Sequence, residues 1–167
     1  MNTTSKYQAK ILAPFGVLGI SCTNNELVRI DFLALSSQLA VPDSPLAQEV
    51  ADQLMSYFKS PDFQFKLPIA LKGTDHQAKV WKAMCAIPRG KTKQYGELAK
   101  ELSSSAQAVG QACGSNPIPI VIPCHRIVSK SGMGGFAHHT EGYELSIKRW
   151  LLNHESLLTK IKECGNE

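Results

Sequence analysis

The sequence lacks closely spaced cysteines. Its five cysteines are odd in number and far apart, and no two of them form a C-x-x-C pair. A disulfide framework needs paired cysteines and a zinc site needs ligands at short spacing, so the pattern argues against both. We therefore expect a protein of the reducing cytoplasm, with no metal and no other cofactor. The cysteines are Cys22, Cys85, Cys113, Cys124 and Cys164.

Long apolar runs are also missing. The first apolar stretch, residues 11–20, is interrupted by Pro14, Gly16 and Gly19, so it has the pattern of neither a secretory signal nor a membrane span. With 167 residues, 43% of them apolar and 19% charged, the chain has the composition of a folded protein with one sizeable core or two small ones. We expect no association with membranes.

Acidic residues are scarce in one segment. Residues 1–72 hold six basic and six acidic side chains, whereas residues 79–130 hold eight basic side chains against Glu97 and Glu101. A local excess of six positive charges is typical of a phosphate-binding face, although a solvated basic surface gives the same count. The eight basic residues are Lys79, Lys82, Arg89, Lys91, Lys93, Lys100, Arg126 and Lys130.

The N-terminal segment has the pattern of a small α/β unit. Residues 16–32 alternate as two strands around an Asn-Asn turn, which predicts a hairpin. Residues 43–58 predict a helix with its apolar side chains on one face and with Asp43 or Ser44 as its N-cap. Residues 63–71 alternate again and predict a further strand.

From Thr74 onward the pattern becomes helical. Thr74 and Gln77 can form a capping box in front of an apolar face, and the stretch IPRGK ends that helix. A second short helix follows with Thr92 as its candidate N-cap, and then a turn of three serines and the segment 106–114. Two helices joined by a short turn on a basic background are typical of helix-turn-helix DNA binding, although most helical hairpins are structural.

The segment 106–114, AQAVGQACG, carries very few large side chains. Each glycine weakens a helix by up to ~1 kcal/mol, so the segment either packs tightly inside the protein or allows something large to approach its backbone. A helix that reads bases in the major groove would present many more long polar side chains. The composition instead suits recognition of groove shape without sequence preference.

The stretch SNPIPIVIPCHRIVSKSG, residues 115–132, places a thiol beside basic groups. Residues 118–122 predict a short buried strand, and Cys124 follows it directly. Buried cysteines are usually inert, and we read the other four in that way. Cys124 differs because His125, Arg126 and Lys130 surround it, and positive charge favours a thiolate. Adjacent side chains on an extended chain point apart, so a turn or a bridging water is needed before the imidazole can take the thiol proton.

The segment IPCHRIV, preceded by GSNPIPIVIP, resembles the active-site motif of the O6-alkylguanine-DNA alkyltransferases, the methylated-DNA–protein-cysteine methyltransferases. GTDHQAKVWKAMCAIPRGKTKQYGELAKEL is similar to the family's helical stretch, and IKRWLLNHE is similar to its closing helix. The resemblance covers most of the chain. It implies an α+β protein, with a small N-terminal α/β, ribonuclease-H-like domain over 1–72. A mostly helical, winged-helix-like DNA-binding domain follows over 73–167.

The resemblance implies a single-use DNA repair protein. An O6-alkylguanine, with O4-alkylthymine as a further candidate substrate, rotates out of the duplex, and the Cys124 thiolate takes its alkyl group. The resulting thioether inactivates the protein. By the same resemblance His125 is the base, acting through a water, Glu155 orients it, Asn116 ties the active-site turn together and Tyr95 gives a proton to the departing guanine. Each of the last three also has an ordinary structural explanation.

The resemblance further implies two groups of binding residues. One group would bind DNA and includes Arg126, although an internal hydrogen-bonding role behind the active site is the preferred alternative for this residue. The other group would line the substrate pocket and includes Trp81, although both Trp81 and Trp150 have the pattern of core residues. The DNA-binding group is Gln107, Ala108, Gly110, Gln111, Thr92, Lys93 and Arg126, and the substrate-pocket group is Phe136, Ala137, Met133 and Trp81.

The chain departs from the family pattern at two places. Gln107 stands where the family usually has an arginine that fills the gap left by the rotated base, and the turn before it is about two residues shorter. The family's aromatic-Ser-Gly-Gly loop appears as Phe136-Ala137, without the Gly-Gly and with about five residues inserted. His138 and His139 lie in this insertion, but no further ligands stand at a spacing suited to a metal.

Two other functions remain open at this point. The first is a protein that binds alkylated lesions without transfer, an option that Gln107 and the insertion leave open. The second is a cysteine hydrolase that uses Cys124, His125 and Glu155, which gives no reason for the basic, small-residue helix. The expected partner is double-stranded DNA, bound by a monomer of which several copies can cluster along the duplex.

Overall fold

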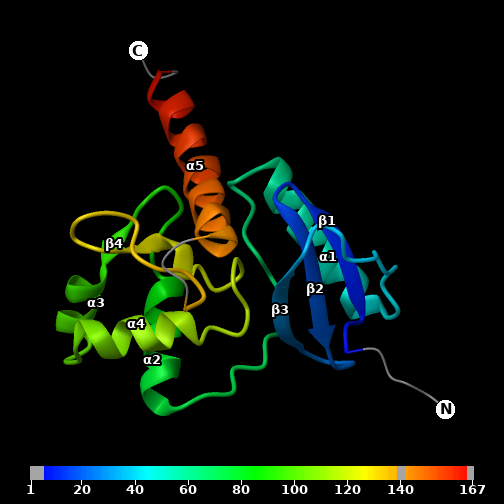
Figure 1. Ribbon diagram of the computed structural model, residues 1–167, viewed down its shortest axis with the longest axis horizontal. Helices are drawn as coiled ribbons and strands as arrows, with labels where there is room; N and C mark the ends of the chain where they lie inside the picture. Colours follow the sequence, from blue (N-terminus) through cyan, green and yellow to red (C-terminus); the bar gives the residue numbers. More distant parts are fainter. Residues whose placement is uncertain (1–5, 139–141, 165–167) are drawn as a thin grey trace. The chain divides into compact units, whose positions relative to one another are not determined.

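The computed structural model describes residues 6–138 and 142–164, with side chains described as far as residue 156. The chain folds into two compact units, Met1–Leu71 and Lys72–Glu167. The first contains a small sheet and one helix, and the second is mostly helical (Figure 1). This confirms the predicted α+β class. Among the described helices, none is both long enough and apolar enough to span a bilayer.

The first unit is a three-stranded antiparallel sheet with one helix packed on it. Its strands are β1 (Ala9–Ala13), β2 (Gly16–Cys22) and β3 (Leu27–Leu33), in the order β1-β2-β3. Strands β2 and β3 form the predicted hairpin, with Ile20 opposite Ile30. The sequence did not predict β1.

Helix α1 (Pro45–Lys59) supplies the other layer of this unit. Ser44 is its N-cap and accepts a hydrogen bond from the amide of Ala47, as one of the two predicted caps would. Its buried face includes Val50 and Leu54, which are fully covered, as expected for apolar residues spaced four apart.

The strand predicted over residues 63–71 is wrong. These residues form no strand apart from an isolated bridge between Ile69 and Leu27. The backbone of Lys66 bonds instead to the side-chain amide of Gln53, which both donates to its carbonyl and accepts from its N–H. Four of the five alternating apolar side chains are half-buried, but the backbone groups of Lys66 are satisfied by a side chain rather than by a neighbouring strand.

The second unit begins with helix α2 (Asp75–Cys85), which has the predicted capping box of Thr74 and Gln77. Helices α3 (Tyr95–Glu101) and α4 (Ala106–Gly114) follow, joined by a short turn, and pack against each other. Helix α2 also packs on α4, where the indole N–H of Trp81 donates to the carbonyl of Ala112 at 2.8 Å. Ser105 caps α4.

The remaining elements of this unit carry the reactive motif. They are the two-residue strands β4 (Lys93–Gln94) and β5 (Ile127–Val128), which pair in parallel, the 3-10 turn η1 (Cys124–Arg126) and the long helix α5 (Tyr143–Cys164), coloured orange to red in Figure 1. Helix α5 packs on η1.

Three predictions of local structure in this unit are wrong. Thr92 does not cap α3, because the chain stays extended through β4 and Gln94 becomes the N-cap. Residues 118–122 form a turn rather than a strand, since the amide of Ile122 donates to the carbonyl of Ile118. Trp150 is half-exposed and stacks on His154 instead of filling the core.

Candidate active site

A folded-back loop holds Cys124 in place. The side chain of Asn116 bridges this loop: its Nδ2 donates to the carbonyl of Ile122 at 2.8 Å, and its Oδ1 accepts from the amide of Ile118 at 3.0 Å. Ile120 at the tip has φ +75°, which is rare and strained for a β-branched residue. The loop is therefore fixed by side-chain hydrogen bonds, and it ends where η1 begins with Cys124.

His125 and Arg126 both face Glu155 of α5. His125 Nε2 lies 2.8 Å from Glu155 Oε1, and the Arg126 guanidinium donates to both oxygens of the same carboxylate at 2.9 and 3.1 Å. Arg126 also donates to the carbonyl of Ile87 at 2.6 Å. Although burial acts to raise the pKa of Glu155, these contacts hold it well below its usual range, so the carboxylate is ionised.

The histidine is neutral and has one free ring nitrogen. Burial lowers the pKa of His125, and this outweighs the opposing effect of Glu155. Because a carboxylate accepts hydrogen bonds, Nε2 carries the ring proton and Nδ1 has a lone pair. Within the part of the chain that the structure describes, Nδ1 has no hydrogen-bond partner. His125 can therefore act as a base.

The Cys124 thiol is almost completely buried. Burial raises its pKa to about 11, while a hydrogen bond from Asn116 and the charge of Lys148 lower it. The resting group is consequently a thiol at neutral pH, and it needs a base before it can react as a nucleophile. The turn η1 places Cys124 and His125 on consecutive positions of one tight turn rather than on an extended strand.

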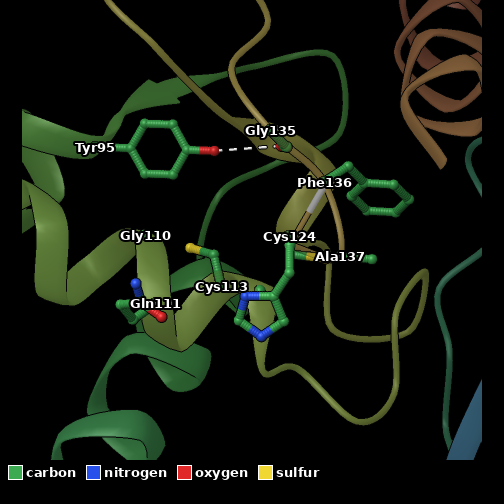
Figure 2. Close-up of a pocket in the computed structure, with 10 residues that line it drawn as sticks. Tyr95, Gly110, Gln111, Cys113, Cys124, Gly135, Phe136 and Ala137 are labelled. Carbon is green, nitrogen blue, oxygen red and sulfur yellow. Dashed lines mark hydrogen bonds between the residues drawn. The ribbon is translucent and has the colours of Figure 1, made fainter. Parts of the chain in front are cut away.

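Cys124 opens into a pocket of about 260 Å³ (Figure 2). Tyr95 forms one wall, and its hydroxyl donates to the carbonyl of Gly135 at 3.3 Å. Burial raises the pKa of Tyr95 to about 12, so the phenol keeps its proton at neutral pH. The lining residues are Tyr95, Gly110, Gln111, Cys113, Gly114, Cys124, Gly135, Phe136, Ala137 and His138.

The pocket depends on the absence of side chains at two glycines. A Cβ on Gly134, which has φ +73°, would lie 2.8 Å from the Tyr95 ring and 3.1 Å from the Ser129 amide nitrogen. A Cβ on Gly114 would collide with the imidazole of His138. Gly114 belongs to the small-residue helix predicted at 106–114. The backbone of that helix therefore has both the His138 ring and the pocket lying against it.

The predicted DNA-binding residues fall mostly on the exposed N-terminal part of α4 and on the segment before α3. Gln107, Gln111 and Thr92 are exposed, and Ala108 and Gly110 are half-buried. Lys93 is also half-buried and forms an ion pair with Glu101 at 2.8 Å. Arg126 is placed differently, because its bonds to Glu155 and Ile87 give it the internal role and not a phosphate-binding one.

Two residues predicted for the substrate pocket do not line it, in contrast to Phe136 and Ala137. Trp81 is 1% exposed and lies in the core between α2 and α4, where its size and its bond to Ala112 place it. Met133 does not line the pocket either, and its backbone carbonyl accepts a hydrogen bond from Lys148.

Several lining or supporting residues are not predicted by the sequence. Cys113, expected to be inert, lies in the pocket wall (Figure 2), and Cys85, expected to be buried, is exposed. Lys148 is a further missed residue, although a lysine on an apolar helix face is a usable signal. His138 lines the pocket, whereas His139 lies outside the described residues. The described residues contain no group of three or more side chains suited to holding a metal.

Comparisons with known proteins agree with this geometry. Residues 75–157 match the family model described as the DNA-binding domain of 6-O-methylguanine DNA methyltransferase, and residues 6–71 match its ribonuclease-like domain. The chain is 36% identical over 157 residues to the methylated-DNA–protein-cysteine methyltransferase of Methanosarcina barkeri, covering 89% of this chain and 96% of that protein.

Solved structures show the same similarity. The Mycobacterium tuberculosis O6-methylguanine methyltransferase superimposes with a TM-score of 0.74 at 34% identity, covering 88% of this chain and 90% of the other. A structure of the Mycobacterium tuberculosis OGT protein in complex with DNA superimposes with a TM-score of 0.73 at 36% identity, covering 88% of this chain and 91% of the other.

Proposed function

The chain belongs to the 6-O-methylguanine DNA methyltransferase family, and from this premise we propose that it repairs DNA by transferring an alkyl group from the O6 atom of guanine to its own Cys124. One observation carries the assignment of the acceptor. Cys124 lies in a small pocket, and the next residue in the chain is a neutral histidine that is held by Glu155 and whose Nδ1 has no hydrogen-bond partner among the residues that the structure describes.

The proposed reaction is a direct displacement. Cys124 Sγ forms a bond to the alkyl carbon, the bond from that carbon to O6 breaks, and its electron pair passes to the guanine ring. His125 takes the thiol proton through one water, while Glu155 holds the proton on Nε2. Tyr95 gives its proton to the departing guanine and regains one from solvent as His125 releases its own. The products are restored guanine and a thioether on Cys124.

The thioether explains why the protein acts once. A sulfur–carbon bond of this kind is not hydrolysed under physiological conditions, so no second step regenerates the thiol. We therefore propose stoichiometric repair, with one alkyl group accepted per protein molecule.

The protein binds DNA through its second unit, and we propose that its partner there is duplex DNA carrying O6-alkylguanine. The reacting atom is inaccessible inside a stacked duplex, so the base must rotate into the pocket. Helix α4 supports this, since Gly110 and Gly114 line the pocket and leave its backbone open to close approach. We further propose a monomer that works in the cytoplasm, where its described cysteines, which are all free, remain thiols.

Binding of lesions without transfer is the less favoured function. It would not need a cysteine in the pocket next to a neutral base, and the curated relatives are named as methyltransferases. A cysteine hydrolase would use the same side chains, those of Cys124, His125 and Glu155. It would have to regenerate its thiol in every cycle, whereas a thioether on Cys124 is not hydrolysed.

Incubation with a duplex that contains O6-methylguanine, followed by intact-mass measurement, separates these functions. We expect the protein to gain one methyl group, on Cys124, and the lesion to disappear in equal molar amount. Cys124→Ser should abolish the gain and keep DNA binding, and Cys85→Ser, at an exposed cysteine outside the pocket, is the matched control. Product in molar excess over protein, or methyl on Cys113, would contradict the proposal. Tight binding without any mass gain would support the lesion-binding function.

A further inference from the structure

Helix α5 carries a lysine that is fully buried. Lys148 is 0% exposed, and its neighbour Ile147 and Leu151 one turn later are equally covered. Lys148 and Glu155 lie seven residues apart and therefore share one face of the helix. An ammonium group is costly to bury unless its hydrogen bonds are satisfied and its charge has a use.

The ammonium group of Lys148 bonds to the backbone on both sides of the active site. Its Nζ donates to the carbonyls of Ile127 at 2.6 Å, Met133 at 2.5 Å and Gly135 at 2.9 Å. Ile127 directly follows the turn that carries Cys124, and Gly135 lies in the pocket wall. The three N–H donors of the ammonium match three acceptors, so the group is fully bonded and rigidly placed.

Lys148 is also linked to Tyr95 through a shared hydrogen-bond acceptor. The Gly135 carbonyl that accepts from Lys148 also accepts from the Tyr95 hydroxyl at 3.3 Å, the bond drawn in Figure 2. Nζ lies 5.9 Å from the centre of the Tyr95 ring, within the range of a cation–π interaction. A change at Lys148 would therefore move both the pocket wall and the phenol.

The charge of Lys148 has no carboxylate partner among the residues that the structure describes, because its bonds go to carbonyls. The titratable groups whose pKa its charge lowers are Cys113 on α4 and Cys124 and His125 on η1, and its ammonium also faces the Tyr95 ring on α3. Burial lowers the pKa of Lys148 to about 8, so it is mostly charged at neutral pH. In turn, its charge lowers the pKa of the Cys124 thiol against the effect of burial.

We propose that Lys148 is the positioning residue of this site: it fixes the carbonyls of Ile127, Met133 and Gly135, and its positive charge compensates the Cys124 thiolate as His125 removes the proton. The inference rests on the proposed function in taking Cys124 as the nucleophile. It adds a role for a residue that does not touch the alkyl group. A purely structural lysine would need the three hydrogen bonds but would leave the reactivity of the thiol unaltered.

The test measures thiol reactivity without DNA. The rate of Cys124 alkylation by iodoacetamide is followed from pH 5 to pH 10, and peptide mass separates Cys124 from Cys113. Lys148→Gln keeps two N–H donors but removes the positive charge. Lys148→Met removes the N–H donors and the charge, and Lys148→Arg keeps the charge. Arg149→Met is the matched control, since it removes one positive charge from an exposed position on the same helix.

We expect Lys148→Gln and Lys148→Met to shift the pH profile to higher pH and to slow alkylation at pH 7 by about tenfold, which corresponds to about one unit in the thiol pKa. Lys148→Arg should restore most of the rate, and Arg149→Met should change nothing. An unshifted profile in a folded Lys148→Gln variant would overturn the proposal. Failure of both neutral variants to fold would assign Lys148 to stability alone and would also overturn it.

Failure of the proposed function would look different. A protein that takes no methyl group from DNA but shows the shifted profile keeps the inference about Lys148 and loses the repair function. A protein that takes the methyl group but shows no shift keeps the function and loses the inference.

Discussion

His125 Nε2 lies 2.8 Å from Oε1 of Glu155, and both side chains are buried. This hydrogen bond determines which ring nitrogen of His125 carries the proton. The ionised carboxylate accepts from Nε2–H, so Nδ1 is left as an acceptor. Arg126 holds the same carboxylate through two hydrogen bonds and keeps it charged. The pair therefore provides a neutral, oriented base next to Cys124 in the chain.

The first prediction concerns Glu155→Gln. The amide can hydrogen-bond to His125, but it carries no charge and can present its NH₂ group to the ring, which would move the proton to Nδ1 and remove the base. Loss of general-base assistance typically slows a reaction by about 10²–10⁴-fold. We expect a loss of this order in the transfer rate, measured with O6-methylguanine duplex and, separately, with free O6-benzylguanine.

Glu26→Gln is the matched control for this variant, because Glu26 is an exposed carboxylate in the first unit. It should leave the transfer rate unchanged. Glu155→Gln also leaves the Arg126 charge without its partner, so folding is checked by thermal unfolding before rates are compared. A folded Glu155→Gln variant with an unchanged rate would show that the carboxylate does not orient the base.

The second prediction is that the protein loses stability as the pH falls from about 7. Burial lowers the pKa of His125 below its usual value of 6.5, so the unfolded chain binds a proton at a pH at which the folded protein does not. Over that interval the free energy of unfolding should fall by up to about 1.4 kcal/mol per pH unit. At lower pH the depressed pKa of Glu155 acts in the same direction, because the unfolded carboxyl takes a proton first.

Urea unfolding at a series of pH values measures this dependence. His125→Gln should flatten the slope just below pH 6.5, since it removes the group responsible. His76→Gln, at a half-buried histidine outside the active site that bonds to Ser104, is the matched control substitution. A stability that rises as the pH falls through this range would contradict a neutral, buried His125.

Local sequence patterns predict the elements whose backbone bonds are local. The hairpin of β2 and β3, the Ser44 cap of α1 and the Thr74–Gln77 capping box all follow from signals within a few residues. The two wrong strands, 63–71 and 118–122, have apolar patterns that suit a strand. In both, a side-chain amide from Gln53 or Asn116 bonds to the backbone, and such a partner is not visible in the pattern of the strand itself.

The active site is predictable from the sequence only in part. Cys124, His125 and Glu155 follow from a motif and a resemblance, and the structure brings the last two into contact. Lys148 supports the reacting groups without reacting itself, so no reactive motif points to it. It lies on α5 beside Ile147 and Leu151, which are fully buried, and a charged residue among such apolar neighbours signals a buried role.

The third prediction concerns non-specific DNA binding. Of the eight basic residues between 79 and 130, five lysines are exposed, whereas Arg126 is bonded internally and Lys93 is paired with Glu101. Affinity for undamaged duplex should therefore fall steeply with salt and depend little on sequence. The double substitution Lys91→Gln/Lys100→Gln should reduce the magnitude of the slope of log K against log salt by up to about 1.8, at about 0.9 for each phosphate that the protein no longer neutralises.

Lys59→Gln/Lys66→Gln is the matched control, since it removes two exposed lysines from the first unit. Fluorescence anisotropy with a labelled duplex at several salt concentrations gives all the slopes. Equal reductions in both double variants, or binding that does not respond to salt, would remove the basis for a phosphate-binding face in the second unit.

The last prediction concerns Gln107. It is the second residue of α4, it is exposed, and it stands where the family usually has an arginine. Extrusion of a base leaves a hole in the stack and costs a few kcal/mol, which the protein must offset. An arginine could fill the hole, stack through its planar guanidinium and bond to the orphaned partner base. Glutamine is shorter and neutral, so the extruded state should be less populated.

Gln107→Arg should therefore speed repair in duplex DNA and hardly change the reaction with free O6-benzylguanine, because the free base needs no extrusion. Gln107→Lys is the matched control: it adds the same charge without a planar group, so it should strengthen DNA binding but give a smaller gain in rate. Rates measured under single-turnover conditions with saturating DNA separate extrusion from binding. Equal acceleration of both substrates, or of neither, would mean that the shortened turn before α4 has moved Gln107 away from the gap and that another residue fills it.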